Sequence, residues 1–292
     1  MTLFCLIVTP AWFMAQQQKV AAAIEYMEKG KLDSARIMID AAALDAETSV
    51  NGETWYVKGF IYKELCKKNY GNIGIIQYGK ESFESLKKTI TLDTSAERKT
   101  ECLRIMKGAL MPYLNNSLAL LMDTAGFGNS EKSLQVMKQI LKYLNPKANV
   151  DSMNISFYNA VGTYYQNQFV RNMSTGGKFL NYAQDAFNKV LIVDPNNYSA
   201  NYNMGIVYYN QGVNLIIRQL DYDADIGTTL ASVEDRAVEY FKRSLPFMLK
   251  AYGINPKKKE PILGLSGIYF SLNENDKYEE FKRKTEEIEN HK

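Results

Sequence analysis

Apolar and small residues recur along the chain at spacings of three and four, which is the period of one face of an α-helix. In residues 154–168 one such face is formed by Tyr158, Val161, Gly162 and Tyr165. A second face follows, formed by Ala183, Phe187 and Val190 ahead of Asp194-Pro195. The residue before a proline is driven out of the α region, so the second helix is expected to end there. The pattern predicts two helices that pack against each other.

The same arrangement recurs along the chain, and six copies are counted. The clearest other copy contains Asn201, Met204, Gly205 and Tyr208. The small residues expected where the two helices of each copy come close are Ala23, Gly59, Gly108, Gly162, Gly205 and Gly267. The copies around Gly108 and Gly267 match least well. Six helical hairpins are therefore predicted, and no alternating strand pattern competes with them.

This pattern of an aromatic residue, a large apolar residue with Gly, and Tyr, followed by Ala, Phe and Pro, resembles the tetratricopeptide repeat. The resemblance covers roughly residues 16 to 290 and implies an all-α superhelix (solenoid) of helix-turn-helix units that binds proteins or peptides. The family's period is about 34 residues. Most copies here are longer, so lengthened helices or loops are expected near residues 69–78, 172–179 and 221–229.

Two prolines lie inside stretches that otherwise predict continuous helix. Pro112 interrupts the run from about Ser95 to Met122, and a kink is expected there, while Pro246 is expected to bend its own helix. The last hairpin, residues 257–292, has a highly charged outer helix, as a terminal cap of a repeat array requires. Its removal is expected to expose Phe241 and Phe247.

The first 15 residues read as an export signal. Residues 3–15 form the only strongly apolar segment, which is too short for the roughly 20 residues that span a bilayer. Ala15 followed by three glutamines offers a cleavage point, although no positive charge precedes the apolar run. The expected division is a signal peptide over 1–15 and a repeat domain over 16–292, in the periplasm or envelope. A buried first helix is the alternative, and the true start could lie upstream of Met1.

Charge and cysteine content narrow the classes of partner. The chain has 292 residues and a net charge of +3, without a long basic stripe, which disfavours nucleic acid as a partner. Apart from Cys5 in the presumed signal, only Cys66 and Cys102 are present, and they lack the spacing of a zinc or redox motif. One disulfide and two inert core thiols remain the alternatives. The oligomeric state is left open.

No cofactor or metal site is predicted. Asp221, Asp223 and Asp225 resemble the start of a calcium loop, but Ile226 and Ser232 stand where that loop needs Gly and a bidentate Glu. The single histidine, His291, lies next to the C-terminus, so no histidine-based triad can be assembled. The chain is therefore not expected to be an enzyme.

Candidate partner-binding residues lie one step around from the packing face on the first helices of three hairpins. In this family the first helices line the inner surface. The first-helix stripe consists of Tyr56, Phe60 and Lys63; Asn159, Thr163, Gln166 and Asn167; and Tyr202, Ile206, Tyr209 and Asn210. Amide groups can bind a peptide backbone through donor and acceptor together, and tyrosine supplies contact area. A solvated face without a ligand is the alternative.

The leading hypothesis is a non-catalytic scaffold that binds protein or peptide partners in the cell envelope. The alternative is a carbohydrate-binding accessory protein of an outer-membrane uptake system, because repeats of this type also occur in glycan-binding lipoproteins. The two Trp residues, the short chain and the lack of a lipid-attachment cysteine disfavour it.

Overall fold

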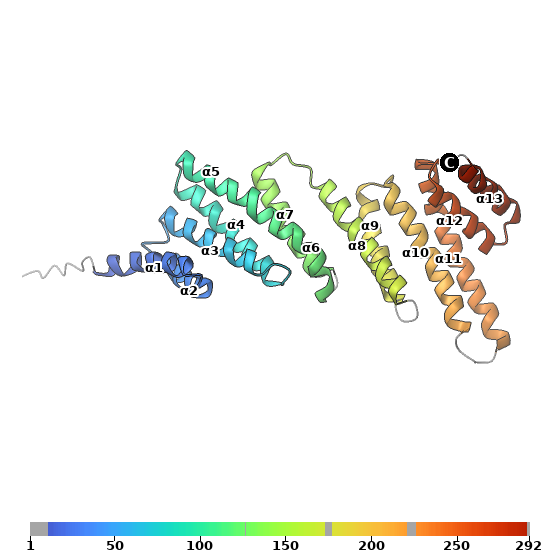
Figure 1. Cartoon of the computed structure of the whole chain (residues 1–292), viewed down its shortest axis with the longest axis horizontal. Coiled ribbons are helices and arrows are strands. Elements are labelled where there is room, and N and C mark those ends of the chain that lie inside the picture. The colour runs from blue at the N-terminus through green and yellow to red at the C-terminus, as the bar shows by residue number, and fades with distance from the viewer. Residues whose placement is uncertain (1–10, 126, 173–176, 221–225, 291–292) are drawn as a thin grey trace, which may run out of the picture. The chain divides into compact units, whose positions relative to one another are not determined.

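The computed structural model describes residues 11–125, 127–172, 177–220 and 226–290, and divides into two compact units, Met1–Ala148 and Asn149–Lys292. Over the described ranges each unit consists of α-helical hairpins (Figure 1). Six hairpins are present in these ranges, as the sequence predicts. The all-α repeat architecture is confirmed.

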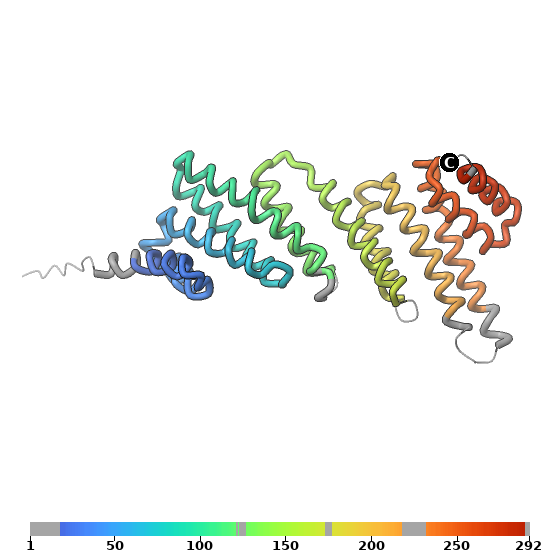
Figure 2. Tube along the Cα trace, in the orientation of Figure 1, coloured from blue at the N-terminus to red at the C-terminus, as the bar shows by residue number. Residues whose placement is uncertain are grey.

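The first unit holds three hairpins and one additional helix. The hairpins pair α1 (Ala11–Glu28) with α2 (Leu32–Ala43), α3 (Gly52–Lys68) with α4 (Gly74–Leu92), and α6 (Met111–Ala125) with α7 (Gly128–Leu144). Helix α5 (Ala96–Ile105) and a π-helical turn, η1 (Met106–Leu110), lead directly into α6. The Cα trace in Figure 2 runs without a turn from α5 to α6, so these segments together act as the first helix of the third hairpin.

The second unit also holds three hairpins. They pair α8 (Asp151–Arg171) with α9 (Gly177–Val193), α10 (Tyr198–Leu220) with α11 (Ile226–Ile254), and α12 (Lys259–Ser271) with α13 (Asn275–Asn290). Helix α10 also packs against α9 and α12, so consecutive hairpins share a core. Pro246 lies inside α11 without ending it. The predicted bend at Pro246 stays a prediction.

The apolar faces predicted from the sequence form the hairpin cores. In the α8–α9 hairpin, Tyr158, Val161 and Tyr165 are buried, and Ala183 and Phe187 are fully buried opposite them. A Cβ atom at Gly162 would lie 2.4 Å from Cζ of Phe187. Only glycine therefore permits the two helices to approach this closely. The predicted role of this small residue is confirmed.

The turn after α1 depends on a left-handed glycine. Gly30 has a φ of +70°, and the amide of Lys31 donates to the carbonyl oxygen of Tyr26 at 2.8 Å. A glycine in this conformation closes many helices because it has no Cβ to clash. The chain can then reverse directly into α2.

The third and sixth hairpins correct two sequence assignments. Gly108 is exposed in η1, and a Cβ there would meet nothing within 4 Å, so it is not the crossing point. The crossing lies instead where Ser133 Oγ donates to the carbonyl oxygen of Leu114 at 3.4 Å. A Cβ at Gly267 would make only an ordinary contact, 3.6 Å from the Tyr209 hydroxyl. The helix is irregular just before Pro112, where η1 lies, because a proline ring clashes with the carbonyl group four residues earlier; the predicted kink itself stays a prediction.

The last hairpin packs through one apolar cluster. Leu265, Ile268 and Phe281 are buried with Met248 of α11, and Tyr202, Ile206 and Tyr209 of α10 pack against the same cluster. Phe247 instead stacks on Tyr208. The surface covered by this hairpin is thus centred on Met248, and the expected exposure of Phe241 and Phe247 on its removal stays a prediction.

Two sequence predictions fall on or near residues whose structure is not described. Residues 1–10 of the presumed signal, and Asp221, Asp223 and Asp225, lie outside the described ranges, while the backbone of residues 11–15 belongs to α1. Export with cleavage near Ala15 therefore stays a prediction. Among the described helices, none combines the length and apolar character needed to cross a bilayer.

Both cysteines of the repeat region are free, buried thiols. Burial raises the pKa of Cys66 to about 12 and that of Cys102 to about 11. The Cys66 thiol lies 3.8 Å from the carbonyl oxygen of Ile75, to which it donates. They are core thiols in this structure, one of the two alternatives left by the sequence.

Candidate functional site

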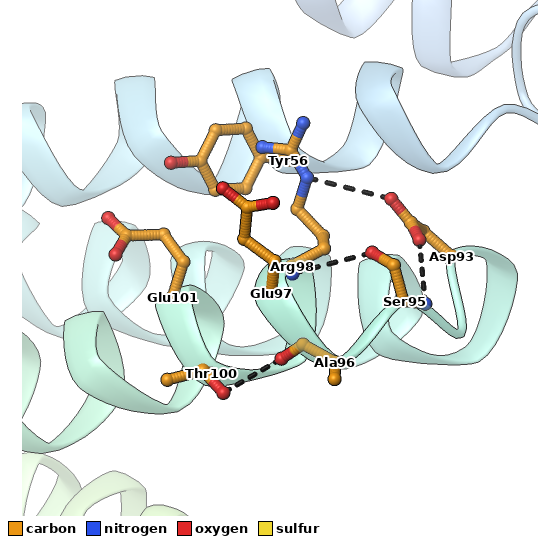
Figure 3. A pocket seen from close by; sticks show the side chains of 8 residues that line it. All are labelled: Tyr56, Asp93, Ser95, Ala96, Glu97, Arg98, Thr100 and Glu101. Atoms are coloured by element: carbon orange, nitrogen blue, oxygen red, sulfur yellow. Dashed lines mark hydrogen bonds and ion pairs between the residues drawn. The ribbon is translucent and has the colours of Figure 1, made fainter.

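A pocket of about 670 Å³ lies beside the first half of α3, where the turn between α4 and α5 passes it. Figure 3 shows Tyr56 of α3 on one side and α5 on the other. The lining residues are Tyr56, Asp93, Ser95, Ala96, Glu97, Arg98, Thr100 and Glu101. We call it the Tyr56 pocket. It joins an aromatic ring to three carboxylates and one guanidinium group.

Helix caps hold the wall of this pocket in place. The side chain of Asn51 accepts a 2.9 Å hydrogen bond from the amide of Glu53 and so starts α3. Ser95 starts α5 by accepting from the amide of Arg98, and its own amide donates to Asp93 at 3.0 Å (Figure 3). A Cβ atom at Gly52 would lie 2.8 Å from Cβ of Asp93, so the α4–α5 turn packs directly on the start of α3.

Arg98 links the elements around the pocket. Its guanidinium group binds Glu53 of α3 at 2.6 Å and Asp93 of the turn at 3.6 Å. Its Cζ atom also lies 3.9 Å from the centroid of the Tyr56 ring. A guanidinium group over an aromatic face is attracted by the electrons of the ring. Arg98 therefore fixes both the ring and the turn.

The neighbouring groups set the charge state of the pocket. Burial, and then the Glu101 carboxylate, raise the pKa of Tyr56, so its hydroxyl group stays neutral at neutral pH. Hydrogen bonds from Arg104 lower the pKa of Glu101, and hydrogen bonds from Ser95 lower that of Asp93. Both carboxylates are ionised at neutral pH. The pocket can accept hydrogen bonds and attract a cation.

Three predicted site residues come together on α3. Tyr56 and Phe60 have ring centroids 6.4 Å apart, and the Lys63 ammonium lies 3.6 Å from the centroid of Phe60. Lys63 also forms an ion pair with Glu64. All three side chains are half-buried. Tyr56 alone of them lines the pocket.

The four predicted residues on α8 divide into two kinds. Asn159 donates to the side chain of Asn197 at 3.3 Å, and Gln166 donates to the carbonyl oxygen of Asn203 at 3.1 Å. These two residues therefore join neighbouring hairpins. Thr163 and Asn167 are exposed. They remain accessible to a ligand.

The predicted residues on α10 are half-buried, and three of them, Tyr202, Ile206 and Tyr209, pack against the cluster of the last hairpin. The Tyr209 ring lies 5.3 Å from that of Phe241, and its hydroxyl oxygen is 3.5 Å from Oγ of Ser271. Tyr202 packs on the α12 cluster, while Asn210 is half-buried. Tyr202, Ile206 and Tyr209 lie one step around from the packing face of their own hairpin, as predicted, but they are not open to a ligand. The next hairpin covers that side of the helix.

The first helices of the second unit carry almost no charge. Residues 152–170 of α8, 198–217 of α10 and 261–271 of α12 contain no Asp, Glu, Lys or Arg, whereas their partner helices α9, α11 and α13 do. On α8 this charge-free surface includes Thr163, Asn167 and Val170, all exposed. An exposed helix face is usually charged. A ligand that contacts α8 here would meet hydroxyl, amide and aliphatic groups of these residues, and no charged side chain of the helix.

The sequence interpretation missed Glu97, Arg98 and Glu101. Their spacing of three and four after the capping Ser95 places them on one helix face, the same signal that selected Tyr56 on α3. The copy that contains them matches the repeat weakly, and its glycine, Gly108, lies away from the helix crossing.

A smaller pocket of about 480 Å³ lies on the same hairpin, between Trp55 and α4. The indole N–H of Trp55 donates to the carbonyl oxygen of Ser49 at 2.7 Å, and the Lys88 ammonium lies 3.8 Å from the centroid of the Trp55 ring.

Within the described part of the chain, no group of three or more His, Cys, Asp or Glu side chains is placed to hold a metal ion.

No family model matches the chain, and no curated protein matches it. A solved TPR repeats protein from Bacteroides fragilis is similar at 13% identity, with 87% of this chain and 97% of that chain covered and a TM-score of 0.43. The MamA protein has 17% identity, coverages of 82% and 95%, and a TM-score of 0.24. The pilF protein of Pseudomonas aeruginosa has 13% identity, coverages of 93% and 98%, and a TM-score of 0.22.

Proposed function

We propose that this chain is a non-catalytic scaffold that binds a segment of a protein or peptide partner at the Tyr56 pocket. The observation that carries the proposal is a half-buried aromatic ring at a pocket whose walls are fixed by helix caps and by Arg98. Aromatic side chains in preformed pockets supply much of the energy of protein recognition. Phe60 and Lys63 extend the contact surface along α3.

The ion pairs around the pocket support a binding role over catalysis. A catalytic site needs a nucleophile with its base, or an acid and base poised to exchange a proton. Here Arg98 binds Glu53 and Asp93, while Arg104 binds Glu101 through two hydrogen bonds of 2.8 and 2.7 Å. Arg98 therefore joins α5 to the start of α3 and to the turn, while the Arg104–Glu101 pair lies within α5.

The proposal includes action in the cell envelope after export. Its support is the apolar run of residues 3–15 followed by a polar start at Gln16. N-terminal sequencing of the native protein is expected to begin near residue 16. A cytoplasmic protein that retains Met1 would rule out this part of the proposal and leave the binding role open.

The binding role is tested by selecting peptides from a random 12-residue library on the full chain. We then expect Tyr56→Ala to weaken the tightest selected peptide by about 2 kcal/mol, the size of an interface hot spot. Tyr182→Ala, which removes an exposed tyrosine in the other unit, is the matched control. Circular dichroism reports whether each variant folds.

Two results would contradict the proposal. One is a library from which no peptide is enriched. The other is an affinity that Tyr56→Ala leaves unchanged while the variant stays folded. A glycan array run on the same sample distinguishes peptide binding from the carbohydrate-binding alternative. If the alternative holds, neutral oligosaccharides bind the protein and peptides do not.

A further inference from the structure

The charged groups that line the Tyr56 pocket are unevenly paired. Arg98 binds Asp93, and Arg104 binds Glu101. Among the described residues the Glu97 carboxylate has neither an ion pair nor a hydrogen bond, and Glu97 is exposed. The pocket thus holds three carboxylates against one guanidinium group. Its one free charge is negative.

Glu97 and Glu101 stand one helical turn apart on α5. Side chains four residues apart lie on the same helix face, with Cβ atoms about 5 to 6 Å from each other. Figure 3 shows both carboxylates on the side of α5 that faces Tyr56. A single cation placed between them can contact both, with the Tyr56 ring beside it.

We propose that the Tyr56 pocket is specific for a basic side chain of the partner, lysine or arginine. The cation binds between Glu97 and Glu101, and the alkyl part of the side chain lies against the Tyr56 ring. This inference rests on the proposed function and names the chemistry of its ligand. Long basic side chains suit such a site because their stems are apolar and their ends charged.

Other ligand classes fit the pocket less well. An anionic group would be repelled by the three carboxylates. An apolar group would remove Glu97 from water without compensation, which is unfavourable. Arg98 already occupies a face of Tyr56 and binds Glu53 and Asp93, so these carboxylates are not available to a second cation. Glu101 is also paired, with Arg104, so Glu97 is the carboxylate that supplies a free negative charge, and Glu101 adds only a further, shared contact to the cation.

The test uses the full chain and the tightest peptide selected from the random library. We expect that peptide to contain a lysine or arginine whose replacement by norleucine weakens binding about fivefold to tenfold, as a partly exposed ion pair with an aromatic contact allows. With Glu97→Gln the same replacement is expected to change the affinity less than about twofold, because the pair is already broken. Glu28→Gln, an exposed glutamate on α1, is the matched control.

The outcomes separate this inference from the proposed function. A peptide that depends on Tyr56 but tolerates norleucine overturns the basic-side-chain specificity and leaves the scaffold role standing. Equal effects of norleucine in wild type and Glu97→Gln also overturn it. A peptide whose binding does not depend on Tyr56 contradicts both the binding role of the Tyr56 pocket and its specificity for a basic side chain. Glu97→Gln breaks no ion pair or hydrogen bond within the described residues and removes only the favourable charge of Glu97 at the start of α5, so the variant is expected to fold with at most a small fall in melting temperature.

Discussion

The hydroxyl group of Ser82 on α4 donates a 2.7 Å hydrogen bond to the carbonyl oxygen of Gly59 on α3. Ser244 on α11 makes the same bond, also 2.7 Å long, to Gly205 on α10. The serine follows its glycine by 23 residues in the α3–α4 hairpin and by 39 residues in the α10–α11 hairpin. The helix crossing is therefore alike in both, and the added length of the longer repeat lies away from it.

The first prediction is that Ser82→Ala and Ser244→Ala each destabilise the protein by about 1 kcal/mol. Both serines are fully buried, so each loss removes a hydrogen bond without a water to replace it. Urea denaturation gives the free energies of unfolding. Ser49→Ala, in an exposed turn, is the control and is expected to change stability by less than about 0.5 kcal/mol. If Ser82→Ala left the free energy of unfolding unchanged, the helix crossing would not depend on this hydrogen bond.

The second prediction compares two helical glycines. Gly162→Ala is expected to destabilise the protein by about 1 to 3 kcal/mol, because the new methyl group would collide with the fully buried Phe187 ring. Gly253→Ala, where nothing lies within 4 Å of the added atom, is expected to raise stability by up to about 1 kcal/mol through helix propensity. Equal effects on the thermal midpoint would contradict the close helix approach at Gly162.

A third prediction concerns the two adjacent tyrosines of α10. Tyr208 stacks on Phe247 with ring centroids 5.7 Å apart and binds Gln184, while Tyr209 contacts Phe241 and Ser271. Each Tyr→Ala change is expected to cost about 2 to 4 kcal/mol in unfolding free energy, since both remove half-buried aromatic packing. Thr163→Ala on the exposed face of α8 is the control. If Tyr209→Ala changed the unfolding free energy no more than the control does, Tyr209 would not contribute to the packing of α10 against the last hairpin.

The fourth prediction is that the native protein resists thiol reagents at pH 8. Burial raises the pKa of Cys66 to about 12, above the ordinary 9.0, so its reactive thiolate is absent at that pH. Labelling of Cys66 and Cys102 is expected only after unfolding, and an aromatic disulfide reagent monitored by absorbance measures the rate. Rapid labelling of the folded chain would contradict their burial.

The same pKa shift predicts how stability changes in alkali. A thiol whose folded pKa is raised contributes stability that is fully present below the unfolded pKa of 9.0 and is lost as the pH rises through about 12. Unfolding free energy measured from pH 8 to 11 is therefore expected to fall less steeply in Cys66→Ala than in wild type.

The spacing of apolar residues predicted the helices well, because the buried face of a helix is set by residues three and four apart in its own sequence. Tyr158, Val161 and Tyr165 are buried as their spacing of three and four requires. The weakly matching third copy failed at Gly108, since a lone glycine in a helical run does not show whether it lies at a crossing. An irregularity near Pro112 was predictable, because proline lacks the amide that an α-helix needs, but its form as the π-helical turn η1 was not.

The spacing of apolar residues is enough to predict the helical class, the six hairpins and the faces that each hairpin buries. Which of the remaining helix faces stay open depends on the packing of neighbouring elements. Tyr56 keeps a pocket beside it because the α4–α5 turn passes at a distance set by Arg98, Asp93 and Gly52. Tyr209 is covered because α12 packs on that side of α10. Periodicity within one helix is the same in both cases, and contacts with the next element along the chain make the difference.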